Sequence, residues 1–204
     1  MLETLNANFI IAIIVAYLLG SISPSTILAK AQGIDIKKEG SGNAGATNTL
    51  RVLGKKAAII TLFIDVGKGV LAVSLAEMIS GPEAAYWAAL AALVGHVWPI
   101  FFKFKGGKGV AVAFGTVLRL DWRIALMMFG LLVVVVAITK IVSIGSLSVC
   151  VAFPIVCWVM HREMFPMSIA MALVVAWKHS DNIKRLINHD ENEVDIGKLL
   201  HGKK

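Results

Sequence analysis

Long stretches of apolar residues follow one another along almost the whole chain, and they constrain its fold more than any other feature. Six of them, of about 14 to 23 residues, approach or reach the roughly 20 residues that a membrane-spanning helix needs. They lie near residues 9–29, 57–79, 84–102, 124–139, 141–160 and 164–177. A seventh, near residues 109–118, is too short to cross unless it begins in an irregular, glycine-rich entry packed inside the protein. The sequence therefore predicts an all-α, polytopic integral membrane protein with seven transmembrane helices, some short or broken.

Composition supports this class, because 57% of the residues are hydrophobic and only 16% are charged. In a typical soluble domain, about half of the residues are hydrophobic and about a quarter are charged. The net charge of +7 is no sign of nucleic-acid binding, since the basic residues lie between the apolar stretches and no nucleic-acid-binding motif is present. The first stretch lacks a basic start, which favours a retained helix over a signal peptide. Cys150 and Cys157 share one apolar stretch without CxxC spacing, so we expect packing residues and neither a disulfide nor a metal site.

Basic residues are distributed unevenly among the connections. With seven spans and the N-terminus outside, sixteen of the twenty Lys and Arg residues fall on one side of the membrane. Arg119, Arg123 and Arg162 fall on the other side, and Lys68 lies within a span. Short cytoplasmic loops accumulate Lys and Arg, so the richer side is the cytoplasmic one. We predict a cytoplasmic C-terminus and one membrane-embedded domain over residues 1–204, with a flexible cytoplasmic tail from about residue 190.

The first glycine-rich segment, residues 40–48, lies on the predicted cytoplasmic side. A bland interpretation is a flexible tether, but a tether needs no hydrogen-bonding side chains, and this segment carries several. It is followed by an arginine, whose planar guanidinium can hold a phosphate through two parallel hydrogen bonds. We predict that the segment binds an anionic ligand through Ser41, Gly42, Asn43, Thr47, Asn48 and Arg51.

The second glycine-rich segment follows the third apolar stretch on the same side. Its lysines could be a positive-inside anchor, and Lys103 fits that role. The adjacent glycines favour an anion site, because they let backbone N–H groups approach a ligand closely. The pattern is not a Walker A loop, since no Ser or Thr follows the lysine. We predict that Lys105, Gly106, Gly107, Lys108 and Gly109 contact a phosphorylated ligand.

Three further groups of residues have two interpretations each. His96 lies one to two helical turns before the second segment, where a lone histidine is more often structural than ligand-binding. Residues 178–185 follow the last span, where polar groups are expected at any membrane interface. Asp65 and Lys68 are three residues apart on one helical face and can pair, either to fix packing or to line a site.

With these residues in view, the chain resembles the bacterial acyl-phosphate:glycerol-3-phosphate acyltransferase family of integral membrane enzymes. The resemblance covers nearly the whole chain and is most specific in residues 40–51 and 104–111. Residues 142–146 and 179–186 also match, the latter more weakly, and we expect residues 143–146 to form a turn on the cytoplasmic side. The chain departs from the family pattern at Ser25, where glycine is usual, at Lys37, where arginine is common, and at His189, which replaces a closing glycine.

The resemblance implies seven helices, the bacterial inner membrane and a cytoplasmic active site. It also implies that the 1-hydroxyl of glycerol 3-phosphate attacks the carbonyl of a fatty acyl phosphate, giving 1-acylglycerol 3-phosphate (lysophosphatidate) and inorganic phosphate. No cofactor or metal is expected, and the protein is expected to be monomeric. Phosphate and glycerol contacts carry over to Ser41, Arg51, Lys108, Ser146, His179 and Asn182. We predict catalytic roles for Lys108, Ser146 and His179, and binding roles for His96, Ser143 and Asn182 besides the two glycine-rich segments. The proton acceptor is either a substrate phosphate oxygen or His179.

Two other classes of function compete with an enzyme. A transporter for a phosphorylated metabolite also uses broken helices and glycine-rich segments. Against it, the motifs gather on one side and the halves of the chain show no internal repeat. A structural scaffold would explain the apolar composition but not the donor-rich segments.

Overall fold

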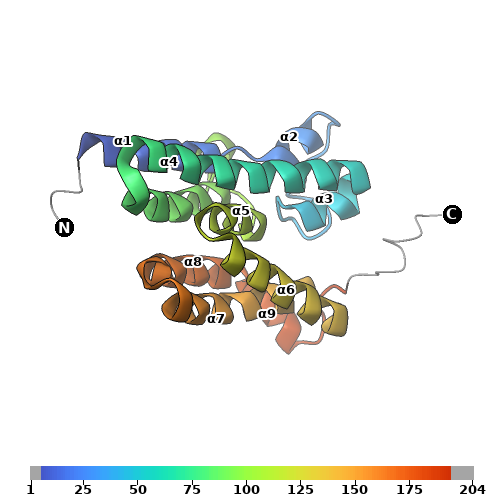
Figure 1. Ribbon diagram of the computed structural model, residues 1–204. Helices are drawn as coiled ribbons and strands as arrows, with labels where there is room; N and C mark the ends of the chain where they lie inside the picture. The colour runs from blue at the N-terminus through green and yellow to red at the C-terminus, as the bar shows by residue number, and fades with distance from the viewer. Residues whose placement is uncertain (1–5, 194–204) are drawn as a thin grey trace. The chain divides into compact units, whose positions relative to one another are not determined.

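A computed structural model describes residues 6–193 of the chain. Its regular secondary structure is helical throughout this range, which confirms the predicted all-α class (Figure 1). The chain divides after Trp122 into two compact units. The predicted single domain is therefore still a prediction.

The first unit contains five α-helices and one short 3-10 helix. They are α1 (Ala7–Gly20), α2 (Pro24–Lys30), α3 (Ala46–Leu53), α4 (Lys55–Val97), η1 (Ile100–Phe102) and α5 (Val110–Leu120). Helix α4 is two helices in one, because Ser80 and Gly81 leave the helical conformation and Gly81 has a φ of 80°. The chain folds back there (Figure 1). This break is the turn that the sequence predicts between the second and third apolar stretches.

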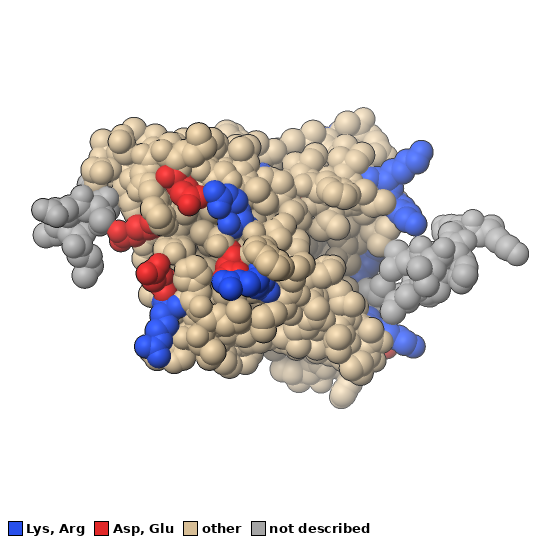
Figure 2. All heavy atoms as spheres, viewed as in Figure 1, with Lys and Arg blue, Asp and Glu red and all other residues tan. Residues whose placement is uncertain are grey.

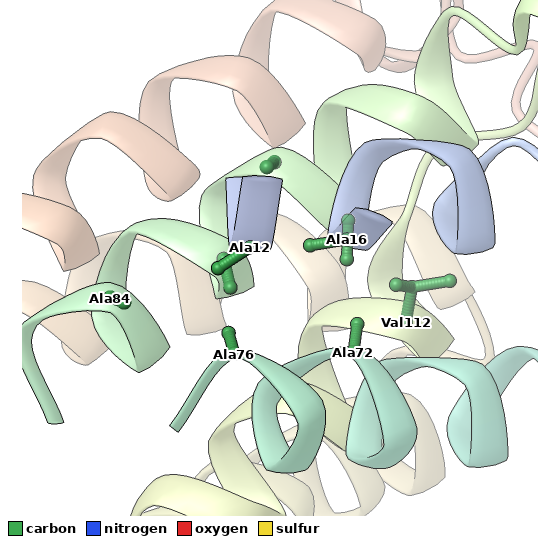
Figure 3. Close-up of a cluster of buried hydrophobic side chains, with 9 residues drawn as sticks. Ala12, Ala16, Ala72, Ala76, Ala84 and Val112 are labelled. Carbon is green, nitrogen blue, oxygen red and sulfur yellow. The ribbon is translucent and has the colours of Figure 1, made fainter. Parts of the chain in front are cut away.

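The centre of the first unit is built from small side chains, which Figure 3 shows facing one another from α1, both halves of α4 and α5. The fully or almost fully buried members are Ala12, Ala16, Ala72, Ala76, Ala84, Ala88, Ala91, Ala92 and Val112. In a membrane, helices associate mainly through close van der Waals contact, which small residues permit. The alanines therefore let α1 and the two halves of α4 approach closely.

Glycines bring two of these helix pairs into main-chain contact. A Cβ atom on Gly95 of α4 would lie 3.0 Å from the backbone nitrogen of Ser21, at the end of α1. A Cβ atom on Gly69 would lie 2.6 Å from the carbonyl oxygen of Val112 in α5. The second distance is shorter than real Cβ contacts, and a Cβ atom on Gly95 would also collide with the carbonyl oxygen of Tyr17, so only glycine fits at these crossings.

The second unit contains α6 (Trp122–Thr139), α7 (Val142–Met160), η2 (Arg162–Met164), α8 (Phe165–Lys178) and α9 (Ser180–Ile187). Helices α7 and α8 pack against each other. Residues 143–146, expected to form a turn, instead belong to the beginning of α7. The residues between the last apolar stretch and the predicted tail form the short helix α9.

Four helical stretches in residues 6–193 are long and apolar enough to cross a membrane: Ala7–Lys30, Lys55–Phe102, Trp122–Thr139 and Val142–Met160. The second contains the break at Gly81, and α5 is a shorter apolar helix. Large apolar side chains such as Phe63 and Val159 are more than 70% exposed. On the face that Figure 2 shows, charged side chains form a few small groups and most of the surface carries none. A helix covers each predicted span, while the count of seven crossings and their orientation stay predictions.

Candidate functional site

The side chain of Asn48 organises the first glycine-rich segment. It is 1% exposed, and its Oδ1 accepts a hydrogen bond from the Ser41 backbone N–H at 2.9 Å. Its Nδ2 donates to the carbonyl oxygens of Glu39 and Ile36 at 3.0 and 3.3 Å. The Nδ2 group and the Oδ1 atom of this amide both bond to main-chain groups, so Asn48 fixes the backbone conformation of the segment.

Two glycines make this shape possible. Gly40 and Gly42 have φ values of 59° and 67°, in the left-handed region that favours glycine. The segment leads into α3, and the side chains of Ser41, Thr47 and Arg51 are exposed while Asn43 is half-buried. The residues predicted to bind an anion therefore stand around a fixed backbone, with Arg51 in the last turn of α3.

The second segment is held by its own amides. The N–H groups of Gly106 and Gly107 donate to the carbonyl oxygens of Val97 and His96 at 3.1 and 3.2 Å. The expectation that these two amides face an anion is therefore not met. The glycines are required here because the segment lies directly against the end of α4, where a Cβ atom on Gly106 would be 2.7 Å from Val97 O.

The two glycine-rich segments meet within the first unit. Lys37, which precedes the first segment, donates from Nζ to the carbonyl oxygen of Gly106 at 3.0 Å. Gly107 lies so close to Ala44 that a Cβ atom on it would be 2.6 Å from the Ala44 carbonyl oxygen. The proximity that the hypothesis of one anion site requires is thus present in the structure.

The lysines of the second segment differ in exposure. Lys105 is exposed, and Lys108 is half-buried between the buried residues Gly107 and Gly109. Gly109 has a φ of 85° and precedes the first residue of α5. Lys108 therefore lies beside the N-terminus of α5, whose helix dipole adds to the positive potential of the lysine.

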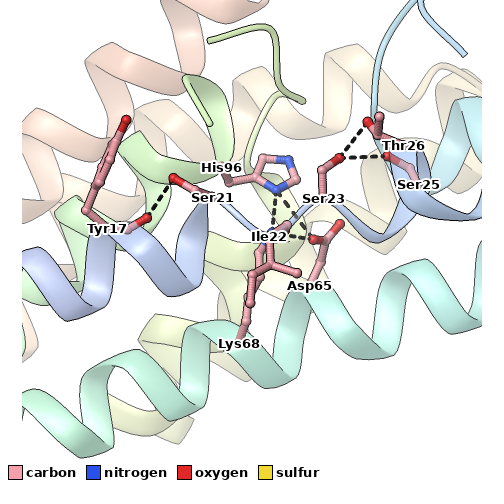
Figure 4. A network of polar contacts seen from close by, with 9 residues as sticks. All are labelled: Tyr17, Ser21, Ile22, Ser23, Ser25, Thr26, Asp65, Lys68 and His96. Atoms are coloured by element: carbon pink, nitrogen blue, oxygen red, sulfur yellow. Dashed lines mark hydrogen bonds and ion pairs between the residues drawn. The ribbon is translucent and has the colours of Figure 1, made fainter. Parts of the chain in front are cut away.

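Asp65, Lys68 and His96 form a buried polar cluster between α4 and the break that separates α1 from α2 (Figure 4). Lys68 Nζ lies 2.7 Å from Asp65 Oδ1, which confirms that the two residues pair. It also lies 2.5 Å from the carbonyl oxygen of Ile22 and 3.0 Å from His96 Nδ1. None of the three side chains is more than 5% exposed. A cation inside an apolar helix pair is thus fully engaged, as its burial demands.

In the second unit, four predicted residues are buried near the ends of α7, α8 and α9. The Ser146 hydroxyl donates to Val142 O at 3.0 Å within α7. His179, which separates α8 from α9, places Nδ1 2.7 Å from the carbonyl oxygen of Val175. A carbonyl oxygen can only accept, so Nδ1 carries the proton and Nε2 is the basic nitrogen of the neutral ring.

Glu191 is a contributor to this unit that the sequence did not single out. Its side chain is 7% exposed and accepts hydrogen bonds from Asn182 at 2.6 Å, Arg185 at 2.7 Å and Ser143 at 3.2 Å. Burial raises the pKa of Glu191, but the hydrogen bonds from Asn182 and Arg185 and the charge of Arg185 outweigh it, so the pKa is held below 4.5. Residue 191 lay in the predicted flexible tail, whose residues 194–204 fall outside the described range. The sequence around Glu191 does not indicate its role, because its hydrogen-bond partners come from α7 and α9.

Within residues 6–193, no group of three His, Cys, Asp or Glu side chains could hold a metal ion.

Comparison with known proteins decides the family. A family model described as glycerol-3-phosphate acyltransferase matches residues 10–189. The chain belongs to the glycerol-3-phosphate acyltransferase family. It is accordingly an acyltransferase and an integral membrane protein, and the predicted family is confirmed.

Relatives and solved structures of the family cover nearly the whole chain. A glycerol-3-phosphate acyltransferase of Prochlorococcus marinus (strain MIT 9211) is 40% identical over 193 residues, which is 91% of this chain and 93% of the relative. The crystal structure of PlsY, an integral membrane glycerol 3-phosphate acyltransferase, in its glycerol 3-phosphate form has a TM-score of 0.89 at 33% identity. It covers 95% of this chain and 98% of that one. The lysophosphatidic acid form has a TM-score of 0.86 at 33% identity and covers 94% and 98%.

Proposed function

We propose that this acyltransferase moves a fatty acyl group from acyl phosphate to the 1-hydroxyl of glycerol 3-phosphate. The products are 1-acylglycerol 3-phosphate (lysophosphatidate) and inorganic phosphate, in the first acylation step of bacterial phospholipid synthesis. The observation that carries the proposal is the junction of the two glycine-rich segments, where Lys37 holds Gly106 and Gly107 abuts Ala44. It brings a donor-rich segment with Arg51 and a lysine-rich segment with Lys108 to one place in a protein of this family.

Both proposed substrates carry phosphate, so binding needs cations and neutral donors. We assign phosphate and glycerol contacts to Ser41, Asn43, Thr47, Arg51, Lys105 and Lys108, with Gly42, Gly106, Gly107 and Gly109 giving the backbone its path. Asn48 is assigned as a positioning residue, because its amide is engaged within its own segment. Cations in a partly desolvated setting attract phosphate more strongly than in water.

The chemistry needs no nucleophile from the protein, because acyl phosphate is a mixed anhydride and already activated. The substrate hydroxyl oxygen forms the new ester bond to the acyl carbon, and the bond from that carbon to the phosphate oxygen breaks. Lys108 stabilises the negative charge that develops on the leaving phosphate, by positioning and electrostatics rather than by covalent catalysis. In the second unit, Ser146 and His179 are assigned to catalysis and Ser143 and Asn182 to binding.

The proton of the attacking hydroxyl has two candidate acceptors, a phosphate oxygen of the substrate and Nε2 of His179. The hydrogen bond from Nδ1 to Val175 leaves Nε2 able to accept a proton. His179→Gln separates the two: loss of about 100-fold or more in turnover identifies His179 as the base, since general bases contribute about 10²–10⁴-fold. A smaller loss identifies the substrate phosphate.

The predicted orientation places both segments on the cytoplasmic side of the inner membrane, where a water-soluble substrate and a lipid substrate can meet. We propose a multi-pass, monomeric enzyme with seven crossings, the N-terminus outside and the C-terminus inside. Cysteine labelling from each side of sealed vesicles tests the orientation. Labelling of a cysteine at Lys38 from outside the cell would overturn it.

Purified protein in detergent tests the reaction. With acyl phosphate and glycerol 3-phosphate together, it should release inorganic phosphate and form lysophosphatidate, and omission of either substrate should stop both. Acyl-coenzyme A in place of acyl phosphate is the matched control for the donor. Acylation from acyl-coenzyme A alone would refute the proposed donor, and uptake of a phosphorylated metabolite without acylation would favour the transporter.

A further inference from the structure

His96 has one ring nitrogen inside the buried cluster and the other at the junction of the glycine-rich segments. Nδ1 lies 3.0 Å from Lys68 Nζ and 3.4 Å from Asp65 Oδ1. On the far side of the ring, a Cβ atom on Gly107 would collide with Nε2 and lie 2.6 Å from the carbonyl oxygen of Ala44. The imidazole therefore spans from the core of the first unit to the place where the two segments meet.

The charges around Nδ1 decide which nitrogen carries the proton. An ammonium group has three hydrogens and no lone pair, so Lys68 can only donate. Its three neighbours are Ile22 O at 2.5 Å, Asp65 Oδ1 at 2.7 Å and His96 Nδ1 at 3.0 Å. A ring nitrogen that accepts from an ammonium group carries no proton itself. His96 is then the neutral imidazole with its hydrogen on Nε2.

This hydrogen is directed at the junction, because Nε2 is the ring nitrogen that lies against Gly107. His96 is 5% exposed, and within residues 6–193 its contacts with Lys68 and Asp65 are both made by Nδ1. Such a donor beside two anion-binding segments suits a ligand oxygen.

We propose that Lys68 and Asp65 are positioning residues that hold His96 as the Nε2–H tautomer, so that His96 donates a hydrogen bond to an anionic oxygen of the substrate. Lys68 supplies the donor to Nδ1, and Asp65 balances the charge of Lys68 inside the membrane region. Ile22 O, left without a helical partner by the break after α1, takes another hydrogen of the ammonium group. The identity of the oxygen rests on the proposed function, whereas the hydrogen placement does not.

The hydrogen placement is tested by 15N NMR of histidine-labelled protein in detergent, since protonated and unprotonated ring nitrogens differ widely in chemical shift. His96→Gln assigns the His96 signals. We expect Nε2 protonated and Nδ1 unprotonated in the wild-type protein without substrate. In Lys68→Met, Asp65 becomes the nearest partner of Nδ1 and should draw the hydrogen there. A wild-type His96 protonated on Nδ1, or on both nitrogens, would overturn the inference.

The link to turnover is tested with Lys68→Met, His96→Phe and the double variant in the phosphate-release assay. Each single variant should lose about 10- to 100-fold in turnover, as expected when a hydrogen bond to a charged group is lost. If Lys68 acts through His96, the double variant should be no slower than His96→Phe alone. Losses that multiply would show that Lys68 acts by another route. Val66→Ala, on the same helix and half-buried, is the folding control.

Failure of the two proposals can be told apart. If the wild-type protein shows the Nε2–H tautomer but does not use acyl phosphate, the proposed donor is wrong and the placement of the hydrogen stands. If the protein uses acyl phosphate but His96 carries its hydrogen on Nδ1, the proposed donor stands and the placement of the hydrogen is wrong.

Discussion

Replacement of Gly69 by alanine should break the contact between α4 and α5. The new methyl group would lie 2.6 Å from Val112 O, 2.9 Å from Thr116 N and 3.2 Å from Gly115 C. These are main-chain atoms of α5, which cannot rotate away as a side chain can. Overpacking costs about 1–3 kcal/mol, and we take the upper value for a main-chain collision. Alanine returns about 1 kcal/mol as the better helix former, which leaves a loss of about 2 kcal/mol.

For a chain of this length, 1 kcal/mol corresponds to about 2–4 °C in Tm, so Gly69→Ala should lower Tm by about 4–8 °C. The matched control is Gly67→Ala in the same helix, where no atom lies within 4 Å of the new methyl group. The control should raise Tm by about 2–4 °C through helix propensity alone. Thermal unfolding in detergent, followed by circular dichroism, measures both. Equal Tm values for the two variants would refute the close main-chain crossing at Gly69.

Other predictions concern the site. Lys108→Ala should remove turnover by about 10²-fold or more while the protein elutes as the wild type in size exclusion, because it removes the assigned charge on the leaving phosphate; near-normal turnover contradicts the assignment. Arg51→Lys should raise the KM for glycerol 3-phosphate about tenfold, since an ammonium group cannot form the paired hydrogen bonds of a guanidinium, and an unchanged KM counts against the contact. Asn48→Ala should lower stability by about 1–3 kcal/mol through the main-chain groups that it leaves unpaired, seen as earlier proteolysis of residues 35–45. Glu191→Gln should be less stable than wild type at neutral pH; because the pKa of Glu191 is lowered by folding, the difference should be full above pH 4.5 and vanish as pH falls through the lower folded value, and a gap that persists in acid disproves the role of the charge.

Much of the helical framework could be predicted from the sequence, because apolar stretches bounded by glycine, proline and charged residues indicate where helices begin and end. The break at Gly81 is an example, since a glycine followed by proline interrupts one long apolar region. The family was also predictable, since its motifs are continuous in sequence. The beginning of α7 was mistaken for a turn, because serines and a glycine favour turns locally, whereas here Gly145 packs against α6 near Leu132 and Val136.

Contacts between distant residues were harder to predict. The pairing of Asp65 with Lys68 was predictable because the two are one helical turn apart. Their contact with His96, almost thirty positions later, depends on how α4 folds back, which no local pattern specifies. The amides of Gly106 and Gly107 show the same limit. The glycines indicated a close approach of the backbone to another group, but that group is the end of α4 and not a ligand.

The interruption between α1 and α2 has a consequence for biogenesis. In hydrocarbon, an orphaned main-chain carbonyl is costly, and that of Ile22 accepts a hydrogen bond from the ammonium group of Lys68, more than forty positions downstream. The break between α1 and α2 therefore cannot make this hydrogen bond until the first half of α4 has been synthesised.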